Sequence, residues 1–415
     1  MHTELRNRWW VVLASVFGLL VGNGPVMQFT FGTMLPEVSR AFGWSRGAVS
    51  ASIVIGLWMT GLATPVFGRL VDRFGIRPVA LPAIAVFSVS TASVALVPAS
   101  RAAFTCLYAL MGLAAASQTP LIYAKAISAR FDAQRGLALG VAMAGVGLGA
   151  ALVPQFAQAL ITLLGWRGAY AGLGALTFAL AFPAVAIVVG RQPRETGLET
   201  AAAANLPGLT GSEAVRTARF WLLAVGFFLV AGTTGGVIAH LVPLLTDRGL
   251  SPARATGLLS MAGLALIGGR VLAGFLLDRI HAPYVAAGFF AAPLVGIAAL
   301  LLTSRPEAAA IGTVLVGMGL GAEVDLIAFL LSRYLGMRCF GEIYGYLFAI
   351  FILGAGAGPF VMGVSFDRTG SYELTLGCSI LALALAIVLM LRLGVYAYPG
   401  RHATEREKRR HAVPI

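Results

Sequence analysis

Apolar stretches recur along the whole chain, and short polar segments separate them. A helix of about 20 apolar residues is long enough to cross a bilayer core of about 30 Å. The pattern therefore predicts an all-α membrane protein with twelve spanning helices. We expect these helices near residues 9–34, 47–71, 78–98, 103–129, 136–162, 169–190, 218–245, 254–277, 283–303, 308–332, 342–365 and 373–396.

The longest polar gap, residues 191–217, follows the sixth predicted helix. It reads as a cytoplasmic linker between two pseudo-symmetric bundles of six helices, 1–190 and 218–396. A basic cytoplasmic tail, 397–415, follows the last helix. Many transporters are built from two similar halves, with the substrate site between them.

The composition agrees with this interpretation. Hydrophobic residues make up 58% of the chain, charged residues 11%, and the mean hydropathy is +0.86. A soluble domain has no interior large enough for that much apolar surface. The three cysteines lack metal-ligand spacing, so we expect no zinc site and no disulfide framework. No nucleotide-binding loop or nucleophile–base set is apparent, so we expect neither an enzyme nor a cofactor.

The basic residues indicate the orientation. With both termini inside, the cytoplasmic segments carry about twenty cations and the outer loops about eight, as the positive-inside rule requires. We therefore expect a multi-pass protein of the bacterial cytoplasmic (inner) membrane with both termini in the cytoplasm. The net charge of +13 is spread over short loops, so we expect no nucleic acid partner. The tail from Arg401 to Arg410 either holds anionic lipid headgroups or is a simple retention signal.

A short motif occurs once in each half, and both copies end a long apolar segment. Gly68-Arg69-Leu70-Val71-Asp72-Arg73 is echoed by Gly274-Phe275-Leu276-Leu277-Asp278-Arg279. With Phe74-Gly75-Ile76-Arg77-Pro78, the first copy resembles the signature between helices 2 and 3 of the major facilitator superfamily. That signature has Gly, Asp-Arg, Gly and a basic residue in this order and spacing. The resemblance covers the whole chain and implies the twelve-helix fold of that family.

The motif implies a latch at the cytoplasmic end. Asp72 can accept hydrogen bonds from backbone N–H groups at the start of a neighbouring helix. Arg73 and Arg77 can pair with cytoplasmic carboxylates such as Asp132 or Glu342. These contacts would hold the inner side closed in the outward-facing state. The simpler alternative is a tight turn with positive-inside charges.

Three further segments narrow the resemblance. Phe42-Gly43-Trp44-Ser45-Arg46, the run from Phe131 to Gly140, and Gly165-Trp166-Arg167 look like bacterial members of the monocarboxylate and oxalate/formate transporter branch. The branch implies an organic anion without identifying the acid. Its oxalate carriers pair an arginine in helix 8 with a lysine in helix 11, whereas residues 343–365 contain no Lys or Arg. A single fixed cation suits a monoanion better than a dianion, although Lys125 could supply a second charge.

Arg270 is the clearest candidate for a substrate-binding residue. It lies eight residues before Asp278, so it is about 12 Å deep and close to the bilayer midplane. An ionisable group there costs about 2.5–3.5 kcal/mol, so it usually faces a cavity. A guanidinium forms paired hydrogen bonds to a carboxylate. We expect Arg270 to bind the substrate carboxylate, as the resemblance also implies; the alternative is a structural pair with Glu323 or Asp325.

Two acidic residues lie at a similar depth in the tenth predicted helix. Glu323 and Asp325 are about 200° apart around a helix, so they cannot both face one cavity. One is expected to pair with Arg270 or to carry a proton, and the other to bond a neighbouring helix. Animal monocarboxylate carriers, which the chain resembles, place an aspartate one turn before the arginine of helix 8, where this chain has Leu266. We therefore expect the proton-coupling or counter-charge role at Glu323 or Asp325.

Polar residues of the first and fourth helices complete the expected pocket. Tyr123 and Lys125 are also about 200° apart. By resemblance to a tyrosine on helix 4 of this branch we favour the Tyr123 face toward the cavity, and the reverse arrangement is the alternative. Asn23 and Gln28 either bond the substrate or tie helix 1 to its neighbours.

The sequence thus predicts a secondary transporter, expected to be a monomer, that moves a small monocarboxylate-like anion by alternating access, together with a proton. The alternatives are an organic-anion antiporter of the oxalate/formate type, a multidrug or hydrophobic-compound exporter, and a sensor that keeps the fold without transport.

Overall fold

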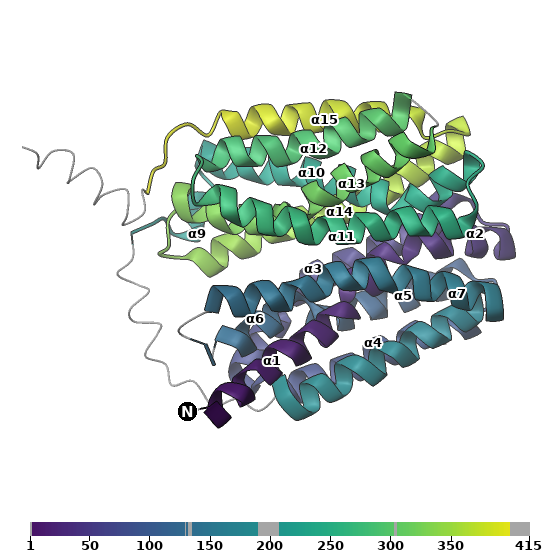
Figure 1. Cartoon of the computed structure of the whole chain (residues 1–415), viewed down its shortest axis with the longest axis horizontal. Coiled ribbons are helices and arrows are strands. Elements are labelled where there is room, and N and C mark those ends of the chain that lie inside the picture. The colour runs from purple at the N-terminus through teal and green to yellow at the C-terminus, as the bar shows by residue number, and fades with distance from the viewer. Residues whose placement is uncertain (1, 129, 132–134, 190–206, 303–304, 399–415) are drawn as a thin grey trace, which may run out of the picture.

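The helices of this protein form two bundles that lie side by side (Figure 1). The computed structural model describes residues 2–128, 130–131, 135–189, 207–302 and 305–398. Within these ranges all regular structure is helical, apart from one isolated bridge between Gly208 and Gly336. Each bundle has a hydrophobic core of its own.

The first bundle comprises the elements before residue 190. They are α1 (His2–Leu20), η1 (Gly24–Phe29), α2 (Phe31–Phe42), α3 (Arg46–Phe74), α4 (Ile76–Ser93), η2 (Val94–Leu96), α5 (Arg101–Ala115), η3 (Ala116–Gln118), α6 (Pro120–Ser128), α7 (Arg135–Pro183) and η4 (Ala184–Val189). The second bundle follows residue 206. Its elements are α9 (Gly211–Ala214), α10 (Ala218–Asp247), α11 (Pro252–Leu277), α12 (Ala282–Leu302), α13 (Pro306–Tyr334), α14 (Phe340–Thr369) and α15 (Glu373–Leu391).

The lengths of these helices agree with the predicted spans. Eleven helices of the described residues are long and apolar enough to cross a membrane, and one of them, Leu137–Ala186, has 50 residues. Gly165 interrupts that helix with φ 72° and ψ 175°, a conformation open to glycine, so α7 is two helices joined at a sharp kink. The predicted fold class, twelve spanning helices in two six-helix halves, is confirmed.

Two of the predicted helices are broken near their middle. The first changes from α1 to the π-helix η1, where Pro25 has no N–H to continue the α-helical ladder. The fourth ends at Ala115 and restarts at Pro120 after a 3-10 turn. Thr119 has ψ 158° because the proline ring excludes the helical region for the residue before it. Side-chain directions on either side of these breaks therefore do not follow the spacing of a single helix.

The two bundles meet along two pairs of helices, α3 with α14 and α7 with α11. Gly363 of α14 lies directly against Gly47 of α3, and Gly263 of α11 lies against Ala151 of α7. Glycine brings the backbones into contact because it has no Cβ. The first contact lies where α3 begins and the second near the middle of α11, and we call the end of the molecule at which α3 and α11 begin the closed end.

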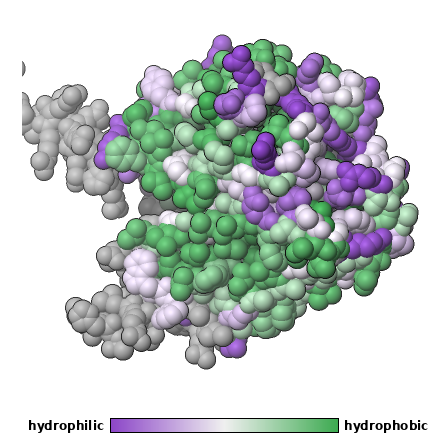
Figure 2. Space-filling model, turned by 45° about the vertical axis from the view of Figure 1, so that its right-hand side comes forward, coloured by the Kyte–Doolittle hydropathy of each residue, from purple (hydrophilic) through white to green (hydrophobic). Residues whose placement is uncertain are grey.

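The same helix faces are apart at the other end. Gly140 lies seven residues before Gly147, which packs on Ile267, and Gly345 lies seven residues before Ile352, which packs on Gly61. Seven residues return to the same side of a helix. A Cβ at Gly140 or Gly345 would nevertheless meet nothing within 4 Å. Figure 2 shows the hollow between the bundles on this side, which we call the open end.

The segment that begins at residue 207 packs on the second bundle at the open end. Leu209 N–H donates to the Leu335 carbonyl at 2.9 Å, and Met337 N–H donates to the Pro207 carbonyl at 2.9 Å. Thr210 and Glu213 form a capping box on α9, and the Thr210 backbone N–H, by bonding the carboxylate, holds the pKa of Glu213 below its usual range. The predicted linker, 191–217, is otherwise largely outside the described residues, as is the tail from residue 399.

Close glycine contacts within a bundle give a test of the fold. A Cβ on Gly112 of α5 would overlap the Gly56 carbonyl of α3, whereas a Cβ on Gly377 of α15 would meet nothing within 4 Å. We expect Gly112→Ala to destabilise the protein by about 1–3 kcal/mol, because α3 and α5 must move apart. Gly377→Ala should be neutral or slightly stabilising, because alanine is the better helix former. Thermal unfolding in detergent measures both, and equal melting temperatures for the two variants would contradict the packing described.

Candidate functional site

Arg270 lies between the bundles, just on the open side of their contact. It is on α11, one turn beyond Ile267, which packs on Gly147 of α7. Its Nε donates to the Gly321 carbonyl at 3.3 Å and is 3.1 Å from Asp325 Oδ2. Its Nη1 is buried and has no hydrogen-bond partner among the described residues. The guanidinium is thus only half satisfied.

Glu323 and Asp325 face different neighbours, as their spacing on α13 requires. Asp325 pairs with Arg270, and its side chain is 40% exposed. Glu323 is completely buried and accepts a hydrogen bond from Thr234 Oγ1 of α10 at 2.9 Å. The carboxylate with access to the cleft is therefore Asp325, whereas Glu323 joins α13 to α10.

Aromatic side chains of α14 continue from this ion pair. Tyr344 lies close enough to Arg270 and Asp325 to interact electrostatically with both. Its ring stacks between those of Phe340 and Phe348, with centroids 5.9 and 5.7 Å away. A half-exposed carboxylate, an under-bonded guanidinium and a neighbouring aromatic surface suit an anion with an apolar body.

The structure places Tyr123 away from this pair. Tyr123 is completely buried, its hydroxyl donates to Gln118 Oε1 at 2.8 Å, and it lies against Gly18 of α1. The expected orientation of Tyr123 toward the cavity does not hold in this conformation. That orientation was implied by resemblance and not by the spacing, since Tyr123 and Lys125 both lie in α6, after the break at Thr119.

The other two expected pocket residues are near the break in the first helix. Asn23 precedes η1, and its Oδ1 is buried without a hydrogen-bond partner in the part of the chain that is described. Gln28 is half-buried and lies against Gly235 of α10, so it is at the contact between the bundles. Neither residue bonds Arg270 among the described residues, so their role in binding stays a prediction.

The repeated motif lies at the open end. Gly75 ends α3 with φ 87°, which explains why a glycine stands there. Arg73 lies over the ring of Phe74 at 5.2 Å, and Arg279 lies over the ring of Phe275 at 3.6 Å. Each arginine thus contacts its own helix while the bundles are apart at this end.

The remaining motif residues add little to this picture. Gly68, Arg77 and Asp278 lie on or beside the same helix ends. The side chain of Asp72 and all of Asp132 lie outside the described residues, so the predicted latch stays a prediction.

Sequence reasoning missed a polar cluster at the closed end, where Arg46 of α3 joins the two bundles. Arg46 pairs with Asp247 of α10 through two bonds of 2.6 and 2.8 Å. Its guanidinium also lies 3.9 Å from the centre of the Phe366 ring. His240 of α10 is completely buried nearby. The signal available in the sequence was a histidine inside an apolar segment, Ile238-Ala239-His240-Leu241.

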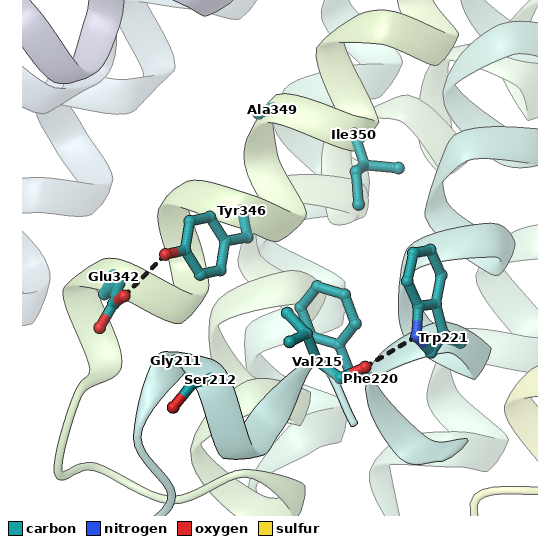
Figure 3. A pocket seen from close by; sticks show the side chains of 9 residues that line it. All are labelled: Gly211, Ser212, Val215, Phe220, Trp221, Glu342, Tyr346, Ala349 and Ile350. Carbon is teal, nitrogen blue, oxygen red and sulfur yellow. Dashed lines mark hydrogen bonds between the residues drawn. The ribbon is translucent and has the colours of Figure 1, made fainter. Parts of the chain in front are cut away.

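A separate pocket of about 450 Å³ lies between α9, α10 and α14 (Figure 3). Glu342 and Trp221 are among its lining residues, and the Glu342 carboxylate accepts a hydrogen bond from Tyr346 at 2.7 Å. The described lining contains an acidic group and no basic one. This pocket therefore does not suit an organic anion, and Arg270 does not belong to it.

Comparison with known families agrees with this geometry. The family model described as Major Facilitator Superfamily matches residues 24–347. The chain belongs to this superfamily. The predicted class, a membrane transporter rather than an enzyme, is thereby confirmed, and the chain is a multi-pass membrane protein.

Several relatives carry names that describe transport. The chain is 29% identical to monocarboxylate transporter 13 of Bos taurus, over 88% of this chain and 84% of that one. It is 27% identical to monocarboxylate transporter 11 of Mus musculus, over 92% and 86%. It is 26% identical to the uncharacterized transporter YcxA of Bacillus subtilis, over 94% and 96%.

A solved structure has a similar fold to this chain. The chain resembles a bacterial homologue of the human lysosomal transporter Spinster in an inward-facing, occupied conformation, with a TM-score of 0.73. The likeness covers 93% of this chain and 97% of that one at 17% identity, so it concerns the fold alone.

The ion pair at Arg270 gives a second test. Asp325→Leu removes the carboxylate that contacts a largely buried guanidinium, and we expect it to lower stability by about 1–3 kcal/mol. Arg270→Leu combined with Asp325→Leu should restore much of that loss, because no charge is then left without its partner. Thermal unfolding of the single and double variants measures the coupling. Simple addition of the two single effects would show that the residues do not stabilise each other.

Proposed function

We propose that this protein moves a small monocarboxylate-like anion across the membrane together with a proton. The observation that carries the proposal is the half-satisfied guanidinium of Arg270, which is next to Asp325 on the open side of the contact between the bundles. A cation at this depth is costly without a partner. A carboxylate substrate supplies the missing hydrogen bonds, and its apolar body can lie on the aromatic rings of α14.

The proposed proton carrier is Asp325. While it is ionised, it occupies one side of Arg270. A proton on Asp325 cancels its charge and leaves the guanidinium for the substrate carboxylate. Loading then exchanges one carboxylate for another beside Arg270, so the net charge between the bundles stays the same. This linkage explains how a proton and an anion could travel together.

We infer that the open end faces the cytoplasm. The cations of the predicted inside segments support this orientation, since Arg73, Arg279 and Arg333 lie at that end. The bundles 1–190 and 218–396 would then rock about the site to open the other side, in a bacterial cytoplasmic membrane. The latch motif would close the cytoplasmic end in that second state.

The single cation of Arg270 suits a substrate with one negative charge better than a substrate with two. Arg270 is the one basic residue of α11 after its first turn, and residues 343–365 have no Lys or Arg. The names of two relatives, monocarboxylate transporters 13 and 11, support the same class. They do not identify the acid.

Uptake into proteoliposomes tests the proposal. Labelled monocarboxylates are offered with an acidic exterior, and we expect accumulation by the wild type. Arg270→Lys keeps the charge but loses the planar fork, so uptake should fall about 10- to 100-fold, as for the loss of a charged hydrogen bond. Asp325→Asn should keep exchange of internal for external acid and lose accumulation driven by the pH gradient. Glu323→Gln, which keeps the bond to Thr234, is the matched carboxylate control and should retain pH-driven accumulation.

Three results would contradict this account in different ways. Unchanged uptake by Arg270→Lys would remove Arg270 from the site and favour an exporter of hydrophobic compounds. Uptake that ignores pH but needs an acid on the opposite side would favour an anion antiporter. Binding without any exchange would favour a sensor.

A further inference from the structure

His240 of α10 contacts residues of both bundles at the closed end, and the proposed function gives it no role. Its Nε2 is 2.9 Å from the Pro359 carbonyl oxygen of α14 and 3.2 Å from Ser50 Oγ of α3. Its Nδ1 is 3.0 Å from the hydroxyl of Tyr372, just before α15. The imidazole is completely buried. A titratable ring therefore sits inside the contact that separates when the molecule changes state.

These partners fit a neutral imidazole. The Pro359 carbonyl can only accept, so Nε2 carries a hydrogen and donates it. Nδ1 then has a lone pair and accepts from the Tyr372 hydroxyl. The Tyr372 oxygen in turn accepts from Arg46 Nη1 at 2.7 Å. Each hydrogen bond in the chain Arg46–Tyr372–His240–Pro359 then has one donor and one acceptor.

A second proton on the His240 ring disturbs this hydrogen-bond arrangement. Nδ1 would then donate to a Tyr372 oxygen that already receives an N–H from Arg46, so two cationic groups would compete for one phenol oxygen. The freed Tyr372 hydroxyl hydrogen would need another acceptor. A buried charge with poor hydrogen bonding is unfavourable.

The acidic groups nearby are already engaged. Asp247 of α10 binds the Arg46 guanidinium through both oxygens. Asp367 of α14 accepts from the backbone N–H groups of Arg46 and Gly47, at 3.0 and 2.8 Å. Both attract a cation at His240, whereas Arg46 repels it. Neither carboxylate bonds the ring, so their attraction acts through space while the donor conflict at Tyr372 is direct.

The charged side chains of α2 and α15 at this end form no hydrogen bond with His240 or Tyr372 among the described residues. On α2, which packs on α10 through Gly32 and Ala239, Glu37 and Arg40 pair with each other at 2.8 Å. On α15, Glu373 is exposed.

We propose that His240 is a proton-binding site that controls the closed end. The ring takes up a proton when the bundles part there and water reaches it. That proton must leave before Ser50, Pro359 and Tyr372 can close around the ring again. Acid therefore shifts the molecule toward the state that is open at this end. The site is separate from Arg270 and needs no substrate, so it stands or falls independently of the transported acid.

The distance between spin labels at the closed end tests the proposal without substrate. Ala99 and Ala253 are exposed there, one in each bundle. Both are changed to cysteine after Cys106, Cys339 and Cys378 are replaced by serine. Asp325→Asn is included so that the ion pair at Arg270 cannot titrate. Pulsed electron resonance in lipid nanodiscs then measures the two populations from pH 8 to pH 5.

We expect the ratio of open to closed molecules to rise as the pH falls, with a limit of about tenfold per pH unit for one proton. His240→Gln keeps a donor and an acceptor but cannot take a proton, so its ratio should not change with pH. His240→Asn is a second non-titrating variant in case the first does not fold. His281→Gln, at the opposite end beside Tyr396, should respond as the unmodified protein does.

Two results would overturn the proposal. The first is a wild-type ratio that is constant or falls in acid, because attraction by Asp247 and Asp367 would then outweigh the conflict at Tyr372. The second is a rise of the same size in both non-titrating variants, which would assign the titration to another group.

Discussion

The ion pair between Arg270 and Asp325 constrains the rest of this molecule. A guanidinium in the middle of a membrane-spanning helix costs about 2.5–3.5 kcal/mol unless a partner is near. The pair places α11 beside α13, and Gly269 and Gly321 let these two helices approach until their backbones touch. Yet Asp325 and the Gly321 carbonyl bond only Nε, and Nη1 has no partner in the described part of the chain. Arg270 is therefore paired well enough to be stable inside the protein, but it still lacks one hydrogen-bond partner. Such a site is suited to a substrate that binds and is released.

The contact between the bundles decides which side can reach that site. Direct glycine contacts join α3 to α14 and α7 to α11, and at the closed end Arg46 adds a bidentate ion pair to Asp247. Small residues allow such surfaces to part and meet again without a large change in packing. The polar cluster around Arg46 and His240 adds an ion pair and hydrogen bonds between the bundles to the apolar packing at the closed end. Transport requires both features, a site with an incomplete shell and a contact that opens.

Much of the fold follows from the sequence because the length of an apolar run is fixed by the bilayer. Counting residues from Asp278 placed Arg270 near the midplane, and the 200° between Glu323 and Asp325 required that they face different neighbours, as they do. The spacing left open whether Tyr123 or Lys125 faces the cavity, and the resemblance that favoured Tyr123 did not anticipate its burial against Gly18 and Gln118. Sequence reasoning missed Arg46, whose ion-pair partner Asp247 is 201 residues away, and His240, whose partners are 119 to 190 residues away in the chain. The local sequence pattern predicts how deep a residue lies in the membrane and on which side of its helix it lies. It does not predict which distant helix packs against that side.

Proton uptake during substrate binding tests the central claim most directly. Calorimetry of a transported monocarboxylate, in buffers with different ionisation enthalpies, gives the number of protons that the protein takes up for each anion bound. The account predicts a value near one in the wild type where Asp325 is ionised before binding, and near zero in Asp325→Asn, which should still bind the anion. Binding without proton uptake by the wild type at any pH would contradict the account, because Arg270 would then accept the substrate while Asp325 stays ionised beside it.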